Sequence, residues 1–427
     1  MDSDISKIVD STVFDVSEYG SISKFVSSHI EWGLEPGSFL VTNLSTIALQ
    51  FKQWRHELPM VEPFYAVKCN PDPVIVRLLA QLGCNFDCAT MGEIDLVLNG
   101  LGENLSLGNR GLAGTSIVYA NPAKMASHLQ FAVDNDVRMT VFDGEDELYK
   151  IAGISGSDSK LDLLIRIATN DRDSVCVFSH KFGCQITDVS RLLSIAQKLG
   201  LNVAGVCFHV GSGCRDPSAY TDAMNDALKV FEIARSLGMK EMSIVDIGGG
   251  FPGDKGDCYG GPGMPTFQDL AKVIRESIKD FCVKVGNRKV RFIAEPGRYF
   301  ASAATSVATK VYARKGGNGG NQALYVDDGV YGTFNSVLYD HAKPVPKKVL
   351  SKGQEKTDDQ DEVEIPTAIF GPTCDGLDQM CDQRFTKLPH CKVNDWILWE
   401  NMGAYTHTAS FVFNGYTHIP NKLHCVL

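Results

Sequence analysis

Short apolar runs alternate with longer amphipathic stretches over most of the chain. The apolar runs lie at residues 64–68, 85–89, 117–120, 138–142, 161–167, 203–209, 243–247 and 291–294. Stretches with a helical spacing of apolar residues separate them, including 74–82, 93–98, 125–135, 188–199, 218–237 and 267–285. This alternation predicts parallel β-α-β units, and eight such units favour a closed α/β barrel over an open doubly wound sheet.

The pattern changes after about residue 304, where the helical spacing fades. Strand-like apolar runs then lie between polar turns at 306–311, 323–326, 367–369 and 396–399. We therefore expect a C-terminal all-β domain of the sandwich or Greek-key type. The predicted domains are a (β/α)8 TIM-like barrel at 37–303 and a β-sheet domain built from 1–36 and 304–427.

Composition narrows the class of protein. The chain has 427 residues, of which 44% are hydrophobic and 22% charged, as in ordinary globular proteins. Its net charge of -10 argues against a nucleic-acid or anionic-membrane partner. We find neither a secretory signal nor a membrane-spanning run. The 13 cysteines form no C-x-x-C pair and no metal-ligand spacing, so we expect reduced thiols, a cytoplasmic location and no metal site.

Polar residues recur where the predicted barrel strands end, which is where the active sites of barrel enzymes lie. They are Lys68, Asp87, Arg166, His209, Asp246 and Glu295. A lysine that leaves a buried strand either extends its ammonium group to water or forms a Schiff base with a carbonyl. Strands often end in polar residues, and a single histidine there is as readily part of the core. Only the combination indicates a site.

Three consecutive glycines, 248–250, follow the seventh predicted strand. Such a turn is either merely flexible or a cradle whose N–H groups bind an anion, and the loops after the last two strands of a barrel often bind phosphate. Arg298 after the eighth strand could add a bidentate contact. A phosphate site, a Schiff-base lysine and a carboxylate for a pyridine nitrogen together indicate pyridoxal 5'-phosphate (PLP).

The predicted β domain carries two further candidate clusters. Cys374 and Asp375 place a thiol beside a carboxylate in the glycine-rich stretch 371–378. Asp327 and Asp328 end a strand-like run and could bind a cationic substrate. The alternatives are an ordinary loop cysteine and a simple Asp-Gly turn.

In combination, these segments resemble the eukaryotic-type ornithine decarboxylases, within the barrel-type PLP-dependent decarboxylases of basic amino acids. The resemblance covers about 37–416 and rests on the stretches PFYAVKCN, FHVGSG, DIGGGFPG, EPGR, DDGVYGTFN, GPTCDGLD and MGAYT. It implies PLP-dependent conversion of L-ornithine to putrescine and CO2, the first step of polyamine biosynthesis. It also implies a homodimer in which the Cys374 loop reaches the partner's active site and Lys181 pairs with Asp378 across the subunits.

The resemblance also implies roles for individual residues. The catalytic residues would be Lys68, His209 and Cys374. The substrate amine would be held by Asp327, Asp328 and Asp375. The cofactor would be bound by Lys68, Asp87, Arg166, His209, Ser212, Gly248, Gly249, Gly250, Glu295, Pro296, Gly297, Arg298 and Tyr405.

Other functions remain open at this stage. They are a lysine, arginine or diaminopimelate decarboxylase of the same family, a catalytically inactive regulator like the antizyme inhibitors, and a PLP-barrel racemase. Retention of Lys68, His209, Glu295 and Cys374 favours an active decarboxylase. Region 121–148, which resembles the antizyme-binding surface, is acidic and has few basic residues. Because antizyme binds this family through an acidic face, we expect no antizyme control.

Overall fold

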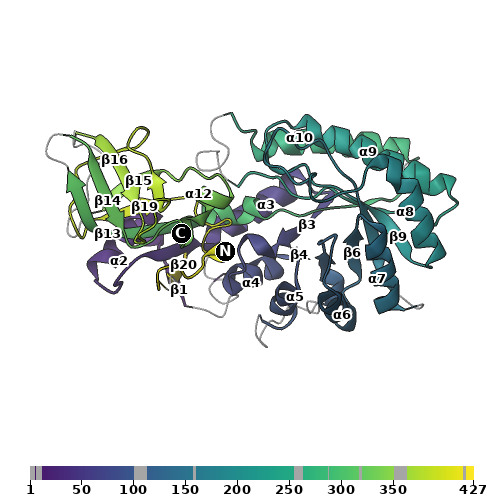
Figure 1. The fold of residues 1–427 in the computed structure, drawn as a ribbon, viewed down its shortest axis with the longest axis horizontal. Helices are drawn as coiled ribbons and strands as arrows, with labels where there is room; N and C mark the ends of the chain where they lie inside the picture. Colours follow the sequence, from purple (N-terminus) through teal and green to yellow (C-terminus); the bar gives the residue numbers. More distant parts are fainter. Residues whose placement is uncertain are drawn as a thin grey trace. The chain divides into compact units, whose positions relative to one another are not determined.

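The computed structural model describes residues 5, 12–100, 113–156, 160–253, 263–286, 288–316, 320–350, 363–416 and 420–427, without the side chains of 347–350. The chain divides into two compact units (Figure 1). We call 50–252 with 263–297 the barrel unit, and 1–49 with 253–262 and 298–427 the sheet unit.

The barrel unit contains eight parallel strands that close in the order β11-β12-β3-β4-β5-β6-β7-β9. Each strand coincides with one of the predicted apolar runs, so the barrel prediction is confirmed. The strands are β3 (Val61–Ala66), β4 (Asn85–Cys88), β5 (Ile117–Tyr119), β6 (Met139–Phe142), β7 (Asp162–Arg166), β9 (Asn202–Cys207), β11 (Ile244–Asp246) and β12 (Arg291–Ala294).

Helices surround the barrel (Figure 1). They are α4 (Pro73–Leu82), α5 (Met91–Leu98), α6 (Ala126–Asp134), α7 (Glu145–Ser155), α8 (Ile186–Lys198), α9 (Ser218–Ser236) and α10 (Phe267–Lys284). Their ends follow from local chemistry: Asp72 caps α4 by accepting from Val74 N, and Gly83 ends it with a φ of 91°. Two short strands, β8 (Ser174–Cys176) and β10 (Ser212–Cys214), form an antiparallel pair that the apolar pattern did not predict.

Apolar side chains form a buried cluster that includes Phe64, Val118, Val141, Leu164 and Ile293, all from barrel strands. Because these side chains fill the interior, polar groups are left to the strand ends.

The sheet unit contains a ten-stranded mixed sheet whose main path is β1-β20-β2-β13-β14-β16-β17. The strands are β1 (Val13–Asp15), β2 (Phe39–Asn43), β13 (Thr305–Gly316), β14 (Gln322–Val326), β15 (Pro346–Leu350), β16 (Ile365–Phe370), β17 (Gln379–Cys381), β18 (Lys387–Leu388), β19 (Trp396–Trp399) and β20 (Asn421–Val426). Short helices α11 (Arg298–Ala301) and α12 (Ser336–Tyr339) also belong to this unit.

The N-terminal part of the sheet unit differs from the all-β expectation. Helix α2 (Ile22–Glu31) begins at Ser21, whose side chain accepts from Lys24 N, and it buries Phe25 and Ile30. Strand β2 pairs with β13 and β20, so residues 37–49 lie in the sheet unit rather than in the barrel, whose bounds therefore differ from the predicted 37–303. Helix α3 (Leu44–Glu57) follows β2. Among the described residues, no helix is both long and apolar enough to cross a membrane.

Candidate active site

Lys68 lies in a short 3-10 turn, η2 (Val67–Cys69), directly after the buried strand β3. Its Nζ donates a 2.5 Å hydrogen bond to Oδ2 of Asp87 in β4. The Lys68 side chain is 42% exposed, whereas that of Asp87 is fully buried. The backbone here is therefore buried while the amine remains reachable, which is what attack on a carbonyl requires.

Glu295 follows strand β12, and Asp246 is the last residue of the neighbouring strand β11. Burial is the main cause that raises the pKa of the Glu295 carboxyl well above its ordinary value, and the negative charges of Asp246 and Asp87 add to it. Burial likewise raises the pKa of Asp246, whose Oδ1 accepts from Gly248 N at 2.9 Å. The carboxyl groups of Asp87, Asp246 and Glu295 thus lie with the Lys68 ammonium group at one end of the barrel.

His209 follows β9 and is held by its own turn. Its Nδ1 accepts a 3.0 Å hydrogen bond from Gly211 N, so any proton on a neutral ring is on Nε2. Burial lowers the pKa of His209 well below its ordinary value, and the charges of Arg166 and Lys68 lower it further. The imidazole edge meets Phe178 at 5.0 Å between ring centroids. A neutral, fixed imidazole can offer its flat face to an aromatic ligand.

The glycine turn after β11 approaches this histidine closely. A Cβ on Gly249 would lie 2.8 Å from His209 Nε2, and one on Gly248, whose φ is 66°, would lie 2.2 Å from Phe208 O. Gly250 also has a positive φ, of 104°, and its place against Gly211 O leaves no room for a side chain. Side chains are thus excluded from this turn, which leaves backbone N–H groups available as a phosphate site needs.

The other predicted cofactor residues of the barrel unit lie at the same strand ends. Arg166 ends β7 and stacks on the Phe182 ring at 5.3 Å. Ser212 begins β10. Pro296 O accepts from Ala66 N just before Lys68, and Gly297 follows it. The donor set therefore suits PLP: an amine, a carboxyl pair, a flat imidazole and a side-chain-free turn.

In the sheet unit, Arg298 begins α11 and lies 5.1 Å from the centroid of the Tyr405 ring. Its Nη2 donates to Asp340 Oδ2 at 2.5 Å. The stretch around Tyr405 packs tightly on α11, since a Cβ on Gly403 would lie 1.8 Å from Ala301 O. Tyr405 itself has a φ of 54°, a conformation that is uncommon for a side-chain-bearing residue and costs free energy.

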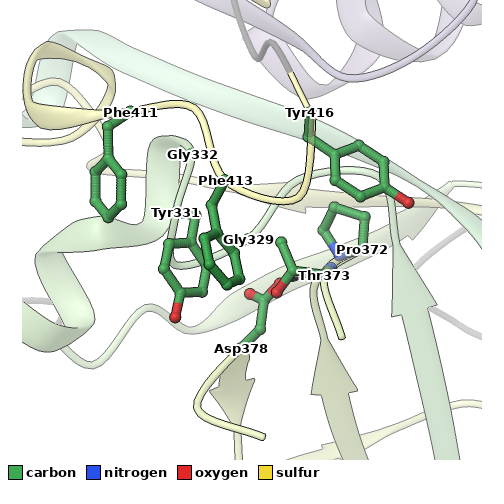
Figure 2. A pocket seen from close by; sticks show the side chains of 9 residues that line it. All are labelled: Gly329, Tyr331, Gly332, Pro372, Thr373, Asp378, Phe411, Phe413 and Tyr416. Atoms are coloured by element: carbon green, nitrogen blue, oxygen red, sulfur yellow. Dashed lines mark hydrogen bonds between the residues drawn. The ribbon is translucent and has the colours of Figure 1, made fainter. Parts of the chain in front are cut away.

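Cys374 lies exposed in the turn between β16 and β17. Its N–H donates to Asn414 Oδ1 at 3.0 Å. The buried Asp378 holds the turn from inside by accepting from Thr373 N, Thr373 Oγ1 and Val330 N at 2.9, 2.6 and 2.9 Å. Figure 2 shows the Asp378 carboxylate beside Thr373. The hydrogen bonds of Asp378 therefore fix the backbone of the turn that carries the exposed Cys374 thiol.

Asp375 follows the cysteine and is kept ionised by two donors. Its Oδ1 accepts from Leu377 N at 3.0 Å and its Oδ2 from the Tyr331 hydroxyl, and these bonds lower the pKa of Asp375. The same hydrogen bond raises the pKa of Tyr331 to about 12. The Tyr331 ring stacks on Phe413 at 4.3 Å, as Figure 2 shows.

The two predicted acidic residues after β14 behave differently. Asp327 accepts from Ser38 N and Lys310 N, each at 2.8 Å. These bonds join the residue before β2 to β13 and give Asp327 a structural role, so we leave it out of the proposed substrate site. Asp328 is fully buried, and its Oδ1 accepts from Gly329 N and Thr333 N.

The structure gives two acidic residues surroundings that the sequence does not predict. Asp246 was noted only as one polar strand end, although the spacing of its strand would have placed it beside Glu295. The resemblance implies that Asp378 pairs with Lys181 across the subunits. Within its own chain, its oxygens accept from Val330 N and from Thr373 N of the Cys374 turn. No sequence signal reports which donors a loop carboxylate will meet.

Comparison with known proteins identifies the class. The family described as "Pyridoxal-dependent decarboxylase, pyridoxal binding domain" matches residues 44–302. The chain is 39% identical over 393 residues to "Ornithine decarboxylase" of Caenorhabditis elegans, covering 89% of this chain and 85% of that protein. It is 40% identical over 394 residues to "Antizyme inhibitor 2" of Xenopus laevis, covering 90% and 80%.

A solved structure shares the fold. The arginine decarboxylase of Paramecium bursaria Chlorella virus, bound to agmatine, superposes with a TM-score of 0.82 at 29% identity and covers 95% of this chain and 100% of that one. The protein is therefore a PLP-dependent decarboxylase of the barrel type. Within that class, the chain belongs to the eukaryotic-type ornithine decarboxylase family, and its cofactor is PLP.

Proposed function

We propose that this chain decarboxylates L-ornithine to putrescine and CO2, the first step of polyamine biosynthesis. The observation that carries the proposal is the placement of Lys68, Asp87, His209 and Glu295 at one end of the closed barrel. The curated ornithine decarboxylase named above supports the substrate, since it resembles this chain over most of its length.

The barrel residues would bind and orient the cofactor. Lys68 Nζ would be the amine that anchors the cofactor. Glu295 holds the proton on the pyridine nitrogen, and the His209 ring covers one face. Ser212 and the turn at 248–250 bind the phosphate. The bound ring supplies an electron sink for the electron pair that remains on the substrate α-carbon when CO2 leaves.

The residues of the sheet unit would complete the reaction. Arg298 and Tyr405 add phosphate contacts. The Cys374 thiol holds on Sγ the proton that returns to the α-carbon. Asp328 and Asp375 bind the distal ammonium group of the substrate, and the lowered pKa of Asp375 keeps its charge in place.

We further propose a homodimer with shared active sites. In one chain the Cys374 turn is exposed. Leu377, three residues further along, is 64% exposed, and so is Val412, which lies two residues before Asn414, the acceptor for Cys374 N. Exposed apolar residues beside an ordered turn are typical of a protein interface. The proposed location is the cytoplasm, since every cysteine that the structure describes is a free thiol.

The surface formed by residues 121–148 gives no support for antizyme control. Its two basic residues are already occupied within the chain. Lys124 Nζ is buried and binds Val141 O at 2.6 Å and Glu147 Oε1 at 2.9 Å. Arg138 is bound by Asp136 at 2.8 Å. We propose that this acidic surface does not bind antizyme.

Product analysis tests the proposed function. The purified protein with PLP and L-ornithine is expected to form putrescine and CO2 in equal amounts. Lys68→Ala should form neither, while Lys279→Ala, an exposed lysine on α10, serves as the matched control. Absence of both products from the unmodified protein with PLP bound would favour the inactive, antizyme-inhibitor-like alternative. Release of CO2 only from lysine or arginine would favour the other decarboxylases.

A further inference from the structure

Asp246 lies behind Glu295 and has no part in the proposed roles above. Strands β11 and β12 are neighbours, with Asp246 opposite Ile293 in the register. Just beyond them, Glu295 N donates to Gly248 O at 2.7 Å. The two carboxyl groups therefore leave adjacent strand ends, and their charges act on each other.

The hydrogen bonds of Asp246 are incomplete unless a proton is present. Its side chain is fully buried, and Oδ1 accepts from Gly248 N at 2.9 Å. Its Oδ2 is also buried and meets no donor in the described part of the chain, because Glu295, the side chain within hydrogen-bonding reach of Asp246, is itself a carboxyl group. A buried carboxylate oxygen without a donor is unfavourable. A proton on Glu295 or on Asp246 itself would supply the missing bond between the two groups.

We propose that Asp246 and Glu295 share one proton and that Asp246 is a positioning residue for Glu295. Without cofactor, the proton resides on Glu295 and is donated to Asp246 Oδ2. With PLP bound, it moves to Asp246 Oδ2 and is donated to Glu295, which is then the ionised member facing the pyridine nitrogen. One proton changes oxygen and none is gained or lost. This inference rests on the proposed role of Glu295.

The surrounding charges favour a pair that retains one proton. The Asp87 carboxylate raises the pKa of both members, while Lys68 lowers that of Glu295 and Arg166 lowers that of Asp246. The Cys207 thiol also lies within reach of both charges, but burial raises its pKa and keeps it neutral. His209 stays neutral as well, for the reason given above. Burial opposes a second negative charge in this space.

The test uses the protein without PLP. Because the pair has raised pKa values in the folded state, its stabilising effect is complete below the unfolded pKa values near 4 and is lost as the pH rises through the folded pKa values. Asp246→Asn weakens this titration, because it removes the negative charge that adds to the raised pKa of Glu295, while its amide still accepts from Gly248 N and can donate to Glu295. The melting temperature of Asp246→Asn minus that of the unmodified protein should rise by about 3 °C or more from pH 5 to pH 8.

Three further variants serve as controls for the change in melting temperature with pH. Glu295→Gln should show a rise in the same direction, and the double variant, which has neither carboxyl group, should show the full rise that corresponds to the shared proton. Asp162→Asn is the control, because its amide oxygen can still accept from Asn202 Nδ2. Its melting temperature should change with pH in parallel with that of the unmodified protein. His209 titrates equally in all of them and cancels from the differences. The proposal would be overturned if the melting temperatures of both Asp246→Asn and Glu295→Gln changed with pH in parallel with that of the unmodified protein.

Binding of PLP, followed by absorbance, gives a second readout. Asp246→Asn should bind PLP at pH 7 within about threefold of the unmodified protein, since its amide replaces the protonated carboxyl. A loss of more than tenfold would overturn the proposal, because it would mean that Asp246 must carry the charge itself. If the unmodified protein failed to bind PLP, the proposed function would fail, whereas the pH profiles would still report on the proton pair.

Discussion

The Lys68 ammonium group donates a 2.5 Å hydrogen bond to Asp87, a carboxylate that is fully buried although the lysine is partly exposed. Asp87 thus fixes where the amine lies before any ligand binds. The bond also connects β3 to β4, since each residue follows or belongs to one of these neighbouring strands.

A double-mutant cycle should detect this coupling. Lys68→Met removes the cation beside a buried carboxylate, so it should lower the free energy of unfolding by about 1–3 kcal/mol. Combining it with Asp87→Asn should restore part of that loss, with a coupling of about 1–2 kcal/mol. Urea unfolding without PLP measures each step. Asp95→Asn, on the exposed face of α5, is the control, and purely additive effects would show that the pair is not coupled.

His209 predicts a specific acid sensitivity. Its pKa is lowered in the folded protein, so below about pH 6.5 the unfolded chain binds a proton that the folded protein does not. Stability should therefore fall by up to about 1.4 kcal/mol per pH unit as the pH drops from 6.5 towards the folded pKa. His209→Gln should reduce this slope in urea unfolding at pH 5 to 7. His56→Gln, whose side chain is 82% exposed, should leave the slope unchanged.

The glycine turn predicts a steric effect on cofactor binding. Alanine at 249 would place its Cβ 2.8 Å from His209 Nε2 and 2.9 Å from Glu295 O. Because both neighbours belong to the site, Gly249→Ala should weaken PLP binding by about tenfold or more, which corresponds to about 1.4 kcal/mol. Gly153→Ala in α7, where nothing lies within 4 Å, should bind PLP normally. Equal affinities for the two variants, measured by fluorescence titration, would argue against this geometry.

Variants of Asp378 and Lys181 distinguish two roles for Asp378: support of the Cys374 turn and a contact across the subunits. Asp378→Asn loses an ionised acceptor for Thr373 and Val330, so it should loosen the Cys374 turn, lower the melting temperature by about 2–4 °C and reduce turnover. Lys181→Ala, in an exposed position beside Phe182, should leave the melting temperature unchanged. Sedimentation velocity then reports the dimer. If both variants merely dissociated the dimer to the same extent, the cross-subunit pair with Lys181 would explain Asp378 better.

Much of the barrel could be predicted because its strands are buried on both faces. Each therefore has a short apolar run at its centre, as in 64–67 and 163–165. Strands β8 and β10 could not be predicted in this way because each is only three residues long and neither is part of the barrel. Helix α2 was missed as well, although Ser21 as its cap and the buried residues Phe25, Val26, His29 and Ile30 carry a helical signal.

The site was only partly accessible from the sequence. Strand ends give the position of Lys68 and Glu295, because the barrel topology brings such ends together. The order of strands in the sequence does not indicate which groups a polar side chain will hydrogen-bond. Asp327 and Asp328 are adjacent and identical in type, yet the first binds the backbone of two strands and the second its own turn. Only tertiary structure distinguishes them.

The most direct test of the central claim is the rate of CO2 release from L-ornithine, L-lysine and L-arginine by the purified, PLP-loaded protein. We predict a kcat/KM for ornithine at least tenfold above that for lysine, because one methylene is worth about 1–3 kcal/mol in such a site, and no measurable release from arginine. A preference for lysine or arginine, or no release from any of the three, would contradict the assignment of ornithine as the substrate.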